Sequence, residues 1–379
     1  MISTEIAVVG GGPAGLAAVL ALAGTGRDVL LIAPAAPPDL RTSALLGGSV
    51  GLIERLGVWE HLREKAAPLR HLRIIDGTRR LLRAPEVTFT SDEVGLEAFG
   101  YNVRNTDLVA ALERVAAQRG IARRDALATA AEIGGDHVLL TLSDGGQVEA
   151  RLVVAADGRR SAMREAAGIV VRSWHYEQAA LVANLRHGLP HHDTSTEFHT
   201  EYGPFTLVPL GDRQSSLVWV GRPEDHARRM ALADDRLAAE IEDRAQSILG
   251  AMVLDGSRQL FPLSGMTARR FADKRVALVG EAGHVVPPIG AQGLNLGLRD
   301  GADLADLVAT APDPGDIVAA FDRKRQFDIV SRTAAIDALN RSVLTGFLPA
   351  QLARGVGVFL LDRVPLLRRA AMRQGLGGA

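Results

Sequence analysis

The sequence predicts an α/β protein in which a Rossmann-like domain is interleaved with a mostly antiparallel sheet domain and followed by a C-terminal helical region. Three observations predict this fold. A glycine-rich turn separates a strand pattern from a helix pattern within residues 5–33. Short strand patterns with turns dominate residues 170–265. A buried-strand pattern returns at about residue 275, and the rest of the chain has mostly helical spacing.

The composition excludes several classes of protein. The chain has 379 residues and a formal net charge of −1, which gives no reason to expect a nucleic-acid partner. It contains no cysteine, which excludes disulfides, thiolate zinc sites, cysteine-ligated iron–sulfur clusters and a redox-active cysteine pair. The lack of cysteine is compatible with a reducing cytosol, and we expect a cytoplasmic location.

The first elements form a predicted βαβ unit. Ile6–Val9 is a continuous apolar run, as expected for a strand buried on both faces. A small-residue helix over 16–23 and a second buried strand over 29–32 follow. Further patterns predict helices over 44–56 and 107–118, and a hairpin of strands 137–143 and 147–154.

The second half adds a sheet and more helices. Strands are expected at 181–184, 205–208, 216–219 and 276–279, and helices over 234–249 and from about residue 293. We expect a dinucleotide-binding domain of residues 1–75, 100–170 and 270–330, a sheet domain of residues 76–99 and 171–269, and a helical region of residues 331–379.

A dinucleotide-binding motif follows the first strand. Residues 10–15 read Gly-Gly-Gly-Pro-Ala-Gly, which supplies G-x-G-x-x-G between a strand and a helix. In this context Gly10 permits the turn, Gly12 permits approach to a pyrophosphate, and Gly15 permits close packing of helix on strand. The acid that normally ends the second strand and binds the ribose is missing, because Ala33 follows Ile32. Arg41, or the backbone near it, is the candidate replacement.

Two later segments also follow predicted strands. Asp157-Gly158 comes after the strand that ends at about residue 155, and by itself it could be only a turn. Residues 280–300 are far more specific. Glu281 can accept hydrogen bonds from sugar or ribityl hydroxyls, two prolines restrict the loop, and free N–H groups at the helix start near Gly293 favour negative charge.

Together these three segments resemble the para-hydroxybenzoate hydroxylase fold family of flavin monooxygenases. The resemblance implies FAD as the resident cofactor and NAD(P)H as a transient reductant. Glu281 stands where most of that family has Asp. The cofactor-binding residues that the resemblance implies are Gly10, Gly12, Pro13, Ala14, Gly15, Arg41, Arg104, Asn105, Asp157, Gly158, Gly280, Glu281, Gly293, Leu294 and Asn295.

Shorter stretches are similar to ubiquinone-biosynthesis hydroxylases of the UbiH/UbiF type. They are Arg41–Leu45, Phe99–Val103, Leu207–Leu210, Ser215–Trp219, Phe261–Leu263 and Pro365–Arg369, and their order along the chain carries the resemblance. It implies hydroxylation of an aromatic ring with O2 and NAD(P)H through a flavin hydroperoxide, on a polyprenylphenol. No catalytic side chain is assigned, and the backbone of Pro288 and Gly290 is expected to line the reacting side.

Other functions stay open. The flavin could serve a hydroxylase of a small soluble aromatic compound, or a non-catalytic subunit of a quinone-biosynthesis complex. A halogenase is disfavoured, because Trp59, Trp174 and Trp219 are isolated and form no W-x-W-x-I-P segment.

Several histidines invite a catalytic or metal-binding role. His284, beside the flavin loop, is interpreted as a packed, hydrogen-bonded side chain rather than a catalytic one. The polar stretch that contains His191, His192, Asp193, Glu197 and His199 fits no helix face, and we interpret it as a polar loop and predict no metal.

The C-terminal stretch 351–373 is apolar and basic, with Asp362 as its only acid. Two interpretations are equally favoured. The stretch could contact an anionic membrane, which would place the protein peripherally at the inner face, or it could cap the core.

Overall fold

The computed structural model describes residues 1–379 except 36, 79–84, 288–290, 345–367, 370–371 and 373–379. Two large sheets dominate it, and the fold class expected from the sequence is confirmed. The first sheet has the strand order β18-β19-β11-β1-β2-β8, with β10 and β9 continuing from β11. Its strands are β1 (Ile2–Val9), β2 (Val29–Ile32), β8 (Ala122–Arg124), β9 (Ala128–Ile133), β10 (Val138–Leu142), β11 (Gln147–Ala155), β18 (Ala272–Asp273) and β19 (Val276–Leu278).

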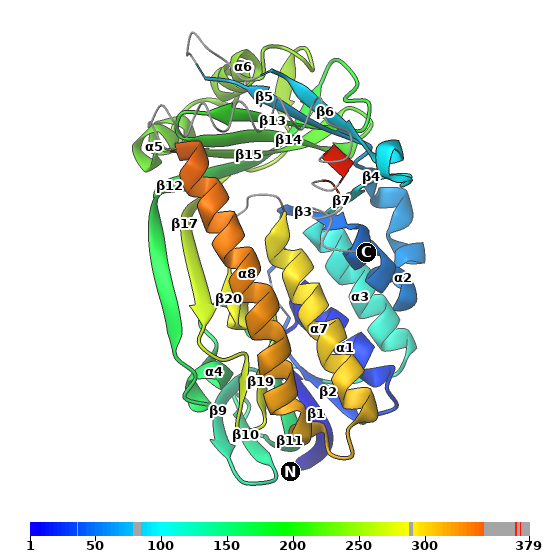
Figure 1. Ribbon diagram of the computed structural model, residues 1–379. Coiled ribbons are helices and arrows are strands. Elements are labelled where there is room, and N and C mark those ends of the chain that lie inside the picture. The colour runs from blue at the N-terminus through cyan, green and yellow to red at the C-terminus, as the bar shows by residue number, and fades with distance from the viewer. Residues whose placement is uncertain (36, 79–84, 288–290, 345–367, 370–371, 373–379) are drawn as a thin grey trace.

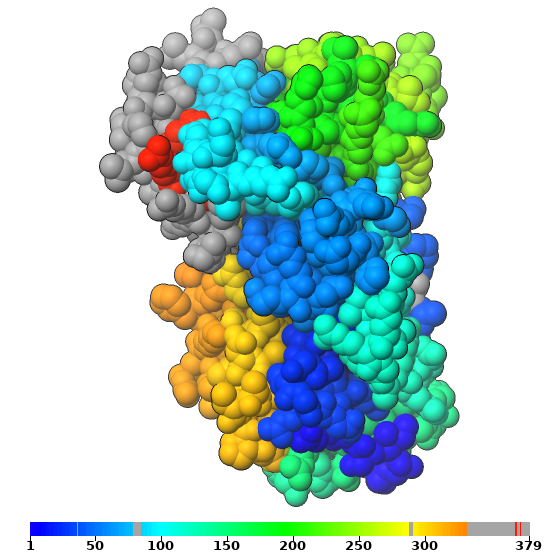
Figure 2. Space-filling model, turned by 90° about the vertical axis from the view of Figure 1, so that its right-hand side faces the viewer, coloured from blue at the N-terminus to red at the C-terminus, as the bar shows by residue number. Residues whose placement is uncertain are grey.

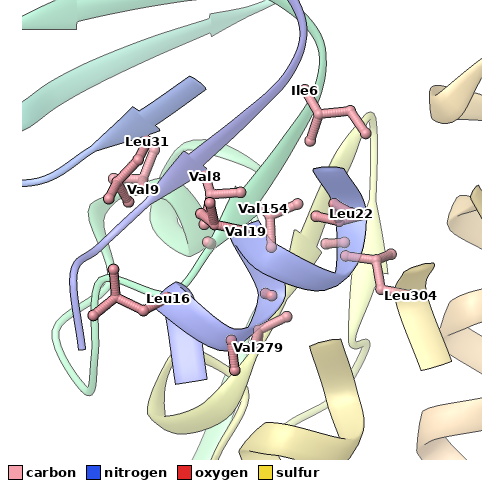
Figure 3. Close-up of a cluster of buried hydrophobic side chains, with 14 of the residues drawn as sticks. Ile6, Val8, Val9, Leu16, Val19, Leu22, Leu31, Val154, Val279 and Leu304 are labelled. Atoms are coloured by element: carbon pink, nitrogen blue, oxygen red, sulfur yellow. The ribbon is translucent and has the colours of Figure 1, made fainter. Parts of the chain in front are cut away.

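The centre of this sheet is parallel and buried on both faces. β1 pairs in parallel with both β2 and β11, and all four residues of β2 are buried. Helix α1 (Pro13–Ala23) packs on the sheet through residues such as Leu16 and Val19 (Figure 3). An aliphatic core therefore lies between α1 and the parallel strands.

Helices α3 (Asn105–Gln118) and α7 (Gln292–Thr310) lie beside α1 on one face of the sheet (Figure 1). The contact between α1 and α7 is close because α7 presents glycines. A Cβ at Gly301 would lie 3.0 Å from Ala18 Cα, so a larger residue there would push the helices apart. Helix α8 (Val318–Leu344) follows α7 and runs up towards the second sheet (Figure 1).

The second sheet has nine strands and is mostly antiparallel, as expected. Its order is β20-β17-β12-β15-β14-β13-β5-β6, with β16 beside β12. The strands are β5 (His71–Asp76), β6 (Val87–Thr90), β12 (Val171–His187), β13 (Thr194–Thr200), β14 (Gly203–Gly211), β15 (Gln214–Gly221), β16 (Met252–Leu254), β17 (Gln259–Ala268) and β20 (His284–Val285). The boundary expected after residue 75 is too late, because β5 begins at His71 and pairs with β13.

Helices α5 (Pro223–Met230) and α6 (Asp234–Arg244) belong to the second sheet's side of the molecule. Leu237 and Ile241 of α6 pack with Leu181 and Leu217 on one face of the sheet. The helix expected over 234–249 ends early, at Arg244, and α5 is not expected from the sequence. The opposite face of the sheet is turned towards the first sheet and its helices (Figure 1).

A small third sheet joins the two large ones. It consists of β3 (Thr42–Leu46), β7 (Gly100–Arg104) and β4 (Ala67–Pro68). Thr42 Oγ1 donates to Ser216 Oγ of β15 at 2.9 Å, which ties this sheet to the second one. The helix expected over 44–56 is wrong for residues 44–46, which pair with β7 as strand, and α2 (Gly47–Arg55) begins only afterwards. Figure 2 shows the mid-blue surface of α2 between the dark-blue N-terminal part and the green second sheet.

Candidate active site

The glycine-rich turn requires glycine at two positions because the backbone is crowded there. Gly10 has φ +121°, and a Cβ on it would lie 2.2 Å from the carbonyl oxygen of Ala156. A Cβ on Gly15 would lie 2.1 Å from the carbonyl oxygen of Gly10. These contacts bring the start of α1 directly against the end of β11.

Gly12 is different, because a Cβ on it would meet no atom within 4 Å. It is the N-cap of α1, whose first turn has no side-chain cap and no acidic residue. The uncapped N–H groups and the positive end of the helix dipole therefore face open space. A pyrophosphate fits this cradle in both shape and charge.

The third motif packs against the first one. Gly280 has φ +62°, and Cβ atoms added to Gly280 or Gly297 would each lie 3.1 Å from Ala14 Cβ. Ala14 on α1 thus contacts both the start of the 280–287 loop and α7. The structure brings these two segments, nearly 270 positions apart, into one site.

Helix α7 begins at the same site. Its N-cap, Ala291, adopts the left-handed conformation with φ +53°, and no side chain caps the helix. Gly293 is exposed and Leu294 is half-buried. The first N–H groups of α7 therefore offer a second set of donors for a negatively charged group. Pro288 and Gly290, expected to line the reacting side, lie outside the described residues.

A buried ionic cluster supports the loop between Gly280 and α7. Asp300 Oδ2 accepts hydrogen bonds from the backbone N–H of Gly280 and from His284 Nε2, both at 2.8 Å. Arg325 of α8 lies 2.7 Å from Asp300 Oδ1, and all three side chains are at most 1% exposed. The interpretation of His284 as a packed, hydrogen-bonded residue is confirmed.

The charges in this cluster stabilise one another. Burial alone would raise the pKa of Asp300, but the charges of His284 and Arg325 outweigh burial and lower it. For Arg325, burial is likewise outweighed by the charges of Asp300, Asp328 and Asp303, which raise its pKa. The sequence gives no signal for Asp300 and Arg325 as partners, because they come together only when α8 packs against α7.

Asn295 connects α7 to the small sheet. Its Oδ1 accepts from the N–H of Leu46 at 2.9 Å, and its Nδ2 donates to the carbonyl of Ala44 at 2.8 Å. The side chain therefore pairs with β3 in the manner of a neighbouring strand. It is predicted to bind the cofactor, but the structure uses its amide to position β3 over the start of α7.

Arg41 and Asn105 lie together around Asp39, which the sequence does not single out. Arg41 Nε and Nη2 donate to the two carboxylate oxygens of Asp39 at 2.8 Å each, and Asn105 Nδ2 donates to Oδ2 at 2.7 Å. The hydrogen bonds that Arg41 donates to Asp39 raise the pKa of Arg41, and the charge of Glu281 acts in the same direction. Arg104 points elsewhere, with Nη2 3.2 Å from Gln214 Oε1.

The Asp157-Gly158 segment also lies at this edge of the first sheet. Asp157 Oδ2 accepts from the N–H of Met163 at 3.3 Å, whereas Oδ1 is buried and has no hydrogen-bond partner among the described residues. Gly158 has φ +81° and its Cβ position is open. Ala33, where the ribose-binding acid would follow β2, is buried and apolar. Glu281 has an exposed carboxylate, and its charge acts on Arg41.

The face of the second sheet that is opposite to α6 is turned towards this site (Figure 1). Val182, Val218 and Thr206 are aligned across β12, β15 and β14 and are half-buried. Glu197 of β13 pairs with Thr206 and continues the row. Glu197 and His199 are therefore strand residues, and the expectation of a polar loop is wrong for them. In the part of the chain that the structure describes, no group of three or more His, Asp or Glu side chains is arranged to hold a metal ion.

The comparisons with known proteins agree with this geometry. A family model described as "FAD binding domain" matches residues 3–313. The chain is 35% identical to ubiquinone hydroxylase UbiL of Rhodospirillum rubrum over 98% of this chain and 89% of that protein. It is 31% identical to 3-demethoxyubiquinol 3-hydroxylase of Escherichia coli over 99% of this chain and 98% of that protein.

Solved structures show the same fold at lower identity. The p-nitrophenol 4-monooxygenase PnpA of Pseudomonas putida superposes with a TM-score of 0.81 at 17% identity, covering 100% of this chain and 99% of that one. The flavin-dependent brominase Bmp2 superposes with a TM-score of 0.79 at 17% identity, covering 99% and 94%. Because oxygenases and a halogenase share the fold, this likeness does not select the chemistry.

Proposed function

The chain belongs to the FAD-binding-domain family and is a flavin-dependent aromatic hydroxylase, and from that premise we propose that its substrate is a polyprenylated phenol of ubiquinone biosynthesis. NAD(P)H is the reductant and O2 the second substrate. Relatives named ubiquinone hydroxylase and 3-demethoxyubiquinol 3-hydroxylase match this chain over nearly its full length. This match is the observation that carries the proposal. When bound, the flavin supplies the redox chemistry that reduces O2 and inserts one oxygen atom into the ring.

The residues of the first and third motifs would hold the cofactor. The start of α1 at Gly12 and Pro13 would bind the pyrophosphate, because its uncapped N–H groups meet open space there. Glu281, exposed at the start of the third motif, would accept hydroxyl hydrogen bonds. The residues that we propose for the cofactor site are Gly10, Gly12, Pro13, Ala14, Gly15, Arg41, Asp157, Gly158, Gly280, Glu281, Gly293 and Leu294.

Three of the residues expected at the cofactor act differently in this proposal. Asn105 holds Asp39, which in turn orients Arg41. Asn295 positions β3 with its side chain and offers only its backbone N–H to the cofactor. Arg104 is directed to Gln214 of the second sheet and is not proposed as a cofactor ligand.

The N-terminal end of α7 would stabilise negative charge on the cofactor when it is bound. The N–H groups of its first turn have no side-chain cap, lie at the end of a 19-residue helix and would need no reorganisation when charge develops. The protein otherwise has to position the ring and exclude water, because an electron-rich phenol is activated by its own oxygen. This division of work explains why no nucleophilic triad is needed at the cofactor.

The second sheet would bind the substrate. Its face towards α7 carries Val182, Val218 and Val208, which are apolar and half-buried. Such a face suits an aromatic ring with a hydrocarbon chain. We propose the sheet of β12–β17 with β5 and β6 as the substrate domain, and the first sheet with α1, α3 and α7 as the flavin domain.

Turnover tests the proposal directly. Purified, FAD-loaded protein is mixed with NADH or NADPH and 2-geranylphenol in detergent, and the hydroxylated product is measured by mass spectrometry. We expect reductant oxidation to be stimulated by the prenylphenol and matched by product. Equal stimulation by 4-hydroxybenzoate would favour a hydroxylase of small soluble aromatics, and no oxidation with any phenol would favour a non-catalytic subunit.

We propose further that the protein works in the cytoplasm against the inner face of the membrane, where a polyprenyl substrate resides. None of the helices formed by the described residues is long and apolar enough to cross a bilayer. Most of the basic C-terminal stretch 351–373 lies outside the described residues. Arg368 is described, and its guanidinium contacts Glu93 and lies 4.5 Å from the centre of the Phe89 ring, which supports a capping role for that residue.

Deletion of residues 351–379 separates these roles. If the stretch contacts the membrane, the deletion lowers co-sedimentation with anionic liposomes while the thermal unfolding of the remainder is unchanged. Unchanged sedimentation with a lower unfolding temperature would leave only the capping role. Co-purification with other quinone-pathway enzymes before and after the deletion tests membership of a complex.

A further inference from the structure

A histidine–glutamate pair lies on β13. His199 Nε2 and Glu197 Oε1 are 2.8 Å apart, and the Thr206 hydroxyl of β14 donates to the other oxygen of Glu197 at 3.4 Å. The His199 side chain is 18% exposed and that of Glu197 is 29% exposed, so both are accessible but mostly enclosed. Neither residue has a role in the cofactor site.

The alternation of side chains along β13 places this pair on the face of the sheet that is opposite to α6. Phe198, which lies between Glu197 and His199, is 1% exposed and packs edge-on against Phe205 in the cluster that includes α6. Because successive side chains of a strand point to opposite faces, Glu197 and His199 point away from α6.

That opposite face is the one that meets the flavin domain. Ser216 lies on it, since its neighbour Leu217 belongs to the α6 cluster, and Ser216 Oγ accepts from Thr42 of β3. β3 in turn is held over the start of α7 by Asn295. The sheet face that carries Ser216 is therefore the one directed towards β3 and the N-terminal end of α7 (Figure 1).

The row of side chains across this face has an apolar part and a polar end. Val182 pairs with Val218, Val218 with Thr206, and Thr206 with Glu197, so the four side chains stand side by side across β12, β15, β14 and β13. An aromatic ring that lies along the valines would meet Thr206 and Glu197 at the β13 end. This arrangement can distinguish the hydroxyl end of a phenol from its hydrocarbon part.

Resting on the proposed function, we propose that His199 accepts the proton of the phenolic hydroxyl and that Glu197 is its positioning residue. The Glu197 carboxylate accepts from Nε2–H, which leaves the lone pair of Nδ1 for the substrate. The phenol O–H bond breaks, its electron pair stays on the oxygen, and the proton forms an N–H bond at Nδ1. The resulting phenolate has a more electron-rich ring than the neutral phenol, and Glu197 stabilises the imidazolium.

The other groups around His199 are compatible with this role. Asp76 of β5 pairs with His199 across the sheet, and its Oδ1 accepts from the N–H and hydroxyl of Thr78. On the other side His199 pairs with Pro204 of β14, which carries no charge. Glu197 and Asp76 therefore flank His199 on β13 and β5.

Binding of 4-nitrophenol, whose phenolate is yellow, tests the proposal without turnover. The FAD-loaded protein is titrated with the phenol, and the ionised fraction of the bound ligand is measured by absorbance across pH in the wild type, His199→Gln and Glu197→Gln. We expect the wild type to favour the bound phenolate. His199→Gln should lower the ionisation constant of the bound phenol by about tenfold, and Glu197→Gln should lower it less.

His137→Gln is the matched control, because His137 also bonds to a nearby carboxylate, Asp136, but lies on the β9–β10 hairpin. It should leave the ionised fraction unchanged. An equal ionised fraction in the wild type and His199→Gln, or no binding by the wild type, would overturn the proposal. Neither result affects the turnover assay with 2-geranylphenol, so the two proposals fail separately.

Discussion

Ala14 of α1 lies against Gly297 of α7 so closely that a Cβ on Gly297 would come within 3.1 Å of the alanine Cβ. This contact joins the first and third motifs. It also places the N-terminal ends of two helices at one site, where both offer uncapped N–H groups to negative charge. The site therefore depends on small residues at the crossing of α1 and α7.

Gly12 provides the sharpest test of the cofactor site. Gly12→Leu should fold normally, because no atom lies within 4 Å of the new Cβ. Its side chain would occupy the space assigned to the pyrophosphate, and FAD binding should weaken by at least about a hundredfold, or about 2.7 kcal/mol. Gly135→Leu, on a loop where the Cβ position is also open, is the control. A yellow, FAD-replete Gly12→Leu protein would refute the assignment.

Asn295→Asp tests the link between α7 and β3. The carboxylate could still accept from Leu46 N–H, but it would face the carbonyl oxygen of Ala44 instead of donating to it. We expect a loss of about 1–3 kcal/mol in the free energy of unfolding, measured with urea, and weaker FAD retention. Retained stability and retained FAD would mean that the amide does not position β3.

Arg325→Met tests the buried cluster under the third motif. The substitution leaves the Asp300 carboxylate buried with one charged partner fewer, which should cost about 3–5 kcal/mol in the free energy of unfolding. Arg323→Met, on an exposed position of the same helix, should cost far less. Similar losses in the two variants would contradict a special role for the cluster.

His226 predicts a pH dependence of stability. Burial and then the charge of Arg229 lower the pKa of His226 from 6.5 to about 4. In the unfolded chain His226 therefore binds a proton near pH 6.5, whereas in the folded protein the same side chain binds one only near pH 4. Stability should be complete above pH 6.5 and should fall by up to about 1.4 kcal/mol per pH unit between these values. His226→Phe should remove this slope, and His137→Gln should keep it.

The sequence determined the parts of the fold that are encoded locally. The βαβ opening, α3 and the β10–β11 hairpin follow from apolar periodicity and turn residues. The glycine motif could be predicted from the sequence because backbone crowding at Gly10 and Gly15 excludes any residue larger than glycine. Residues 44–46 were misassigned because their strand exists only through pairing with β7, whose partner residues lie more than fifty positions away.

Tertiary structure decided which polar side chains work together. Asp300, Arg325 and His284 become partners only when α8 packs on α7, and Asp39 gains importance only when Arg41 and Asn105 converge on it. Glu197 and His199 face the site because Phe198 between them is drawn into the core under α6. Local spacing predicts the backbone, but the direction and partners of a charged side chain depend on which distant surface is packed against it.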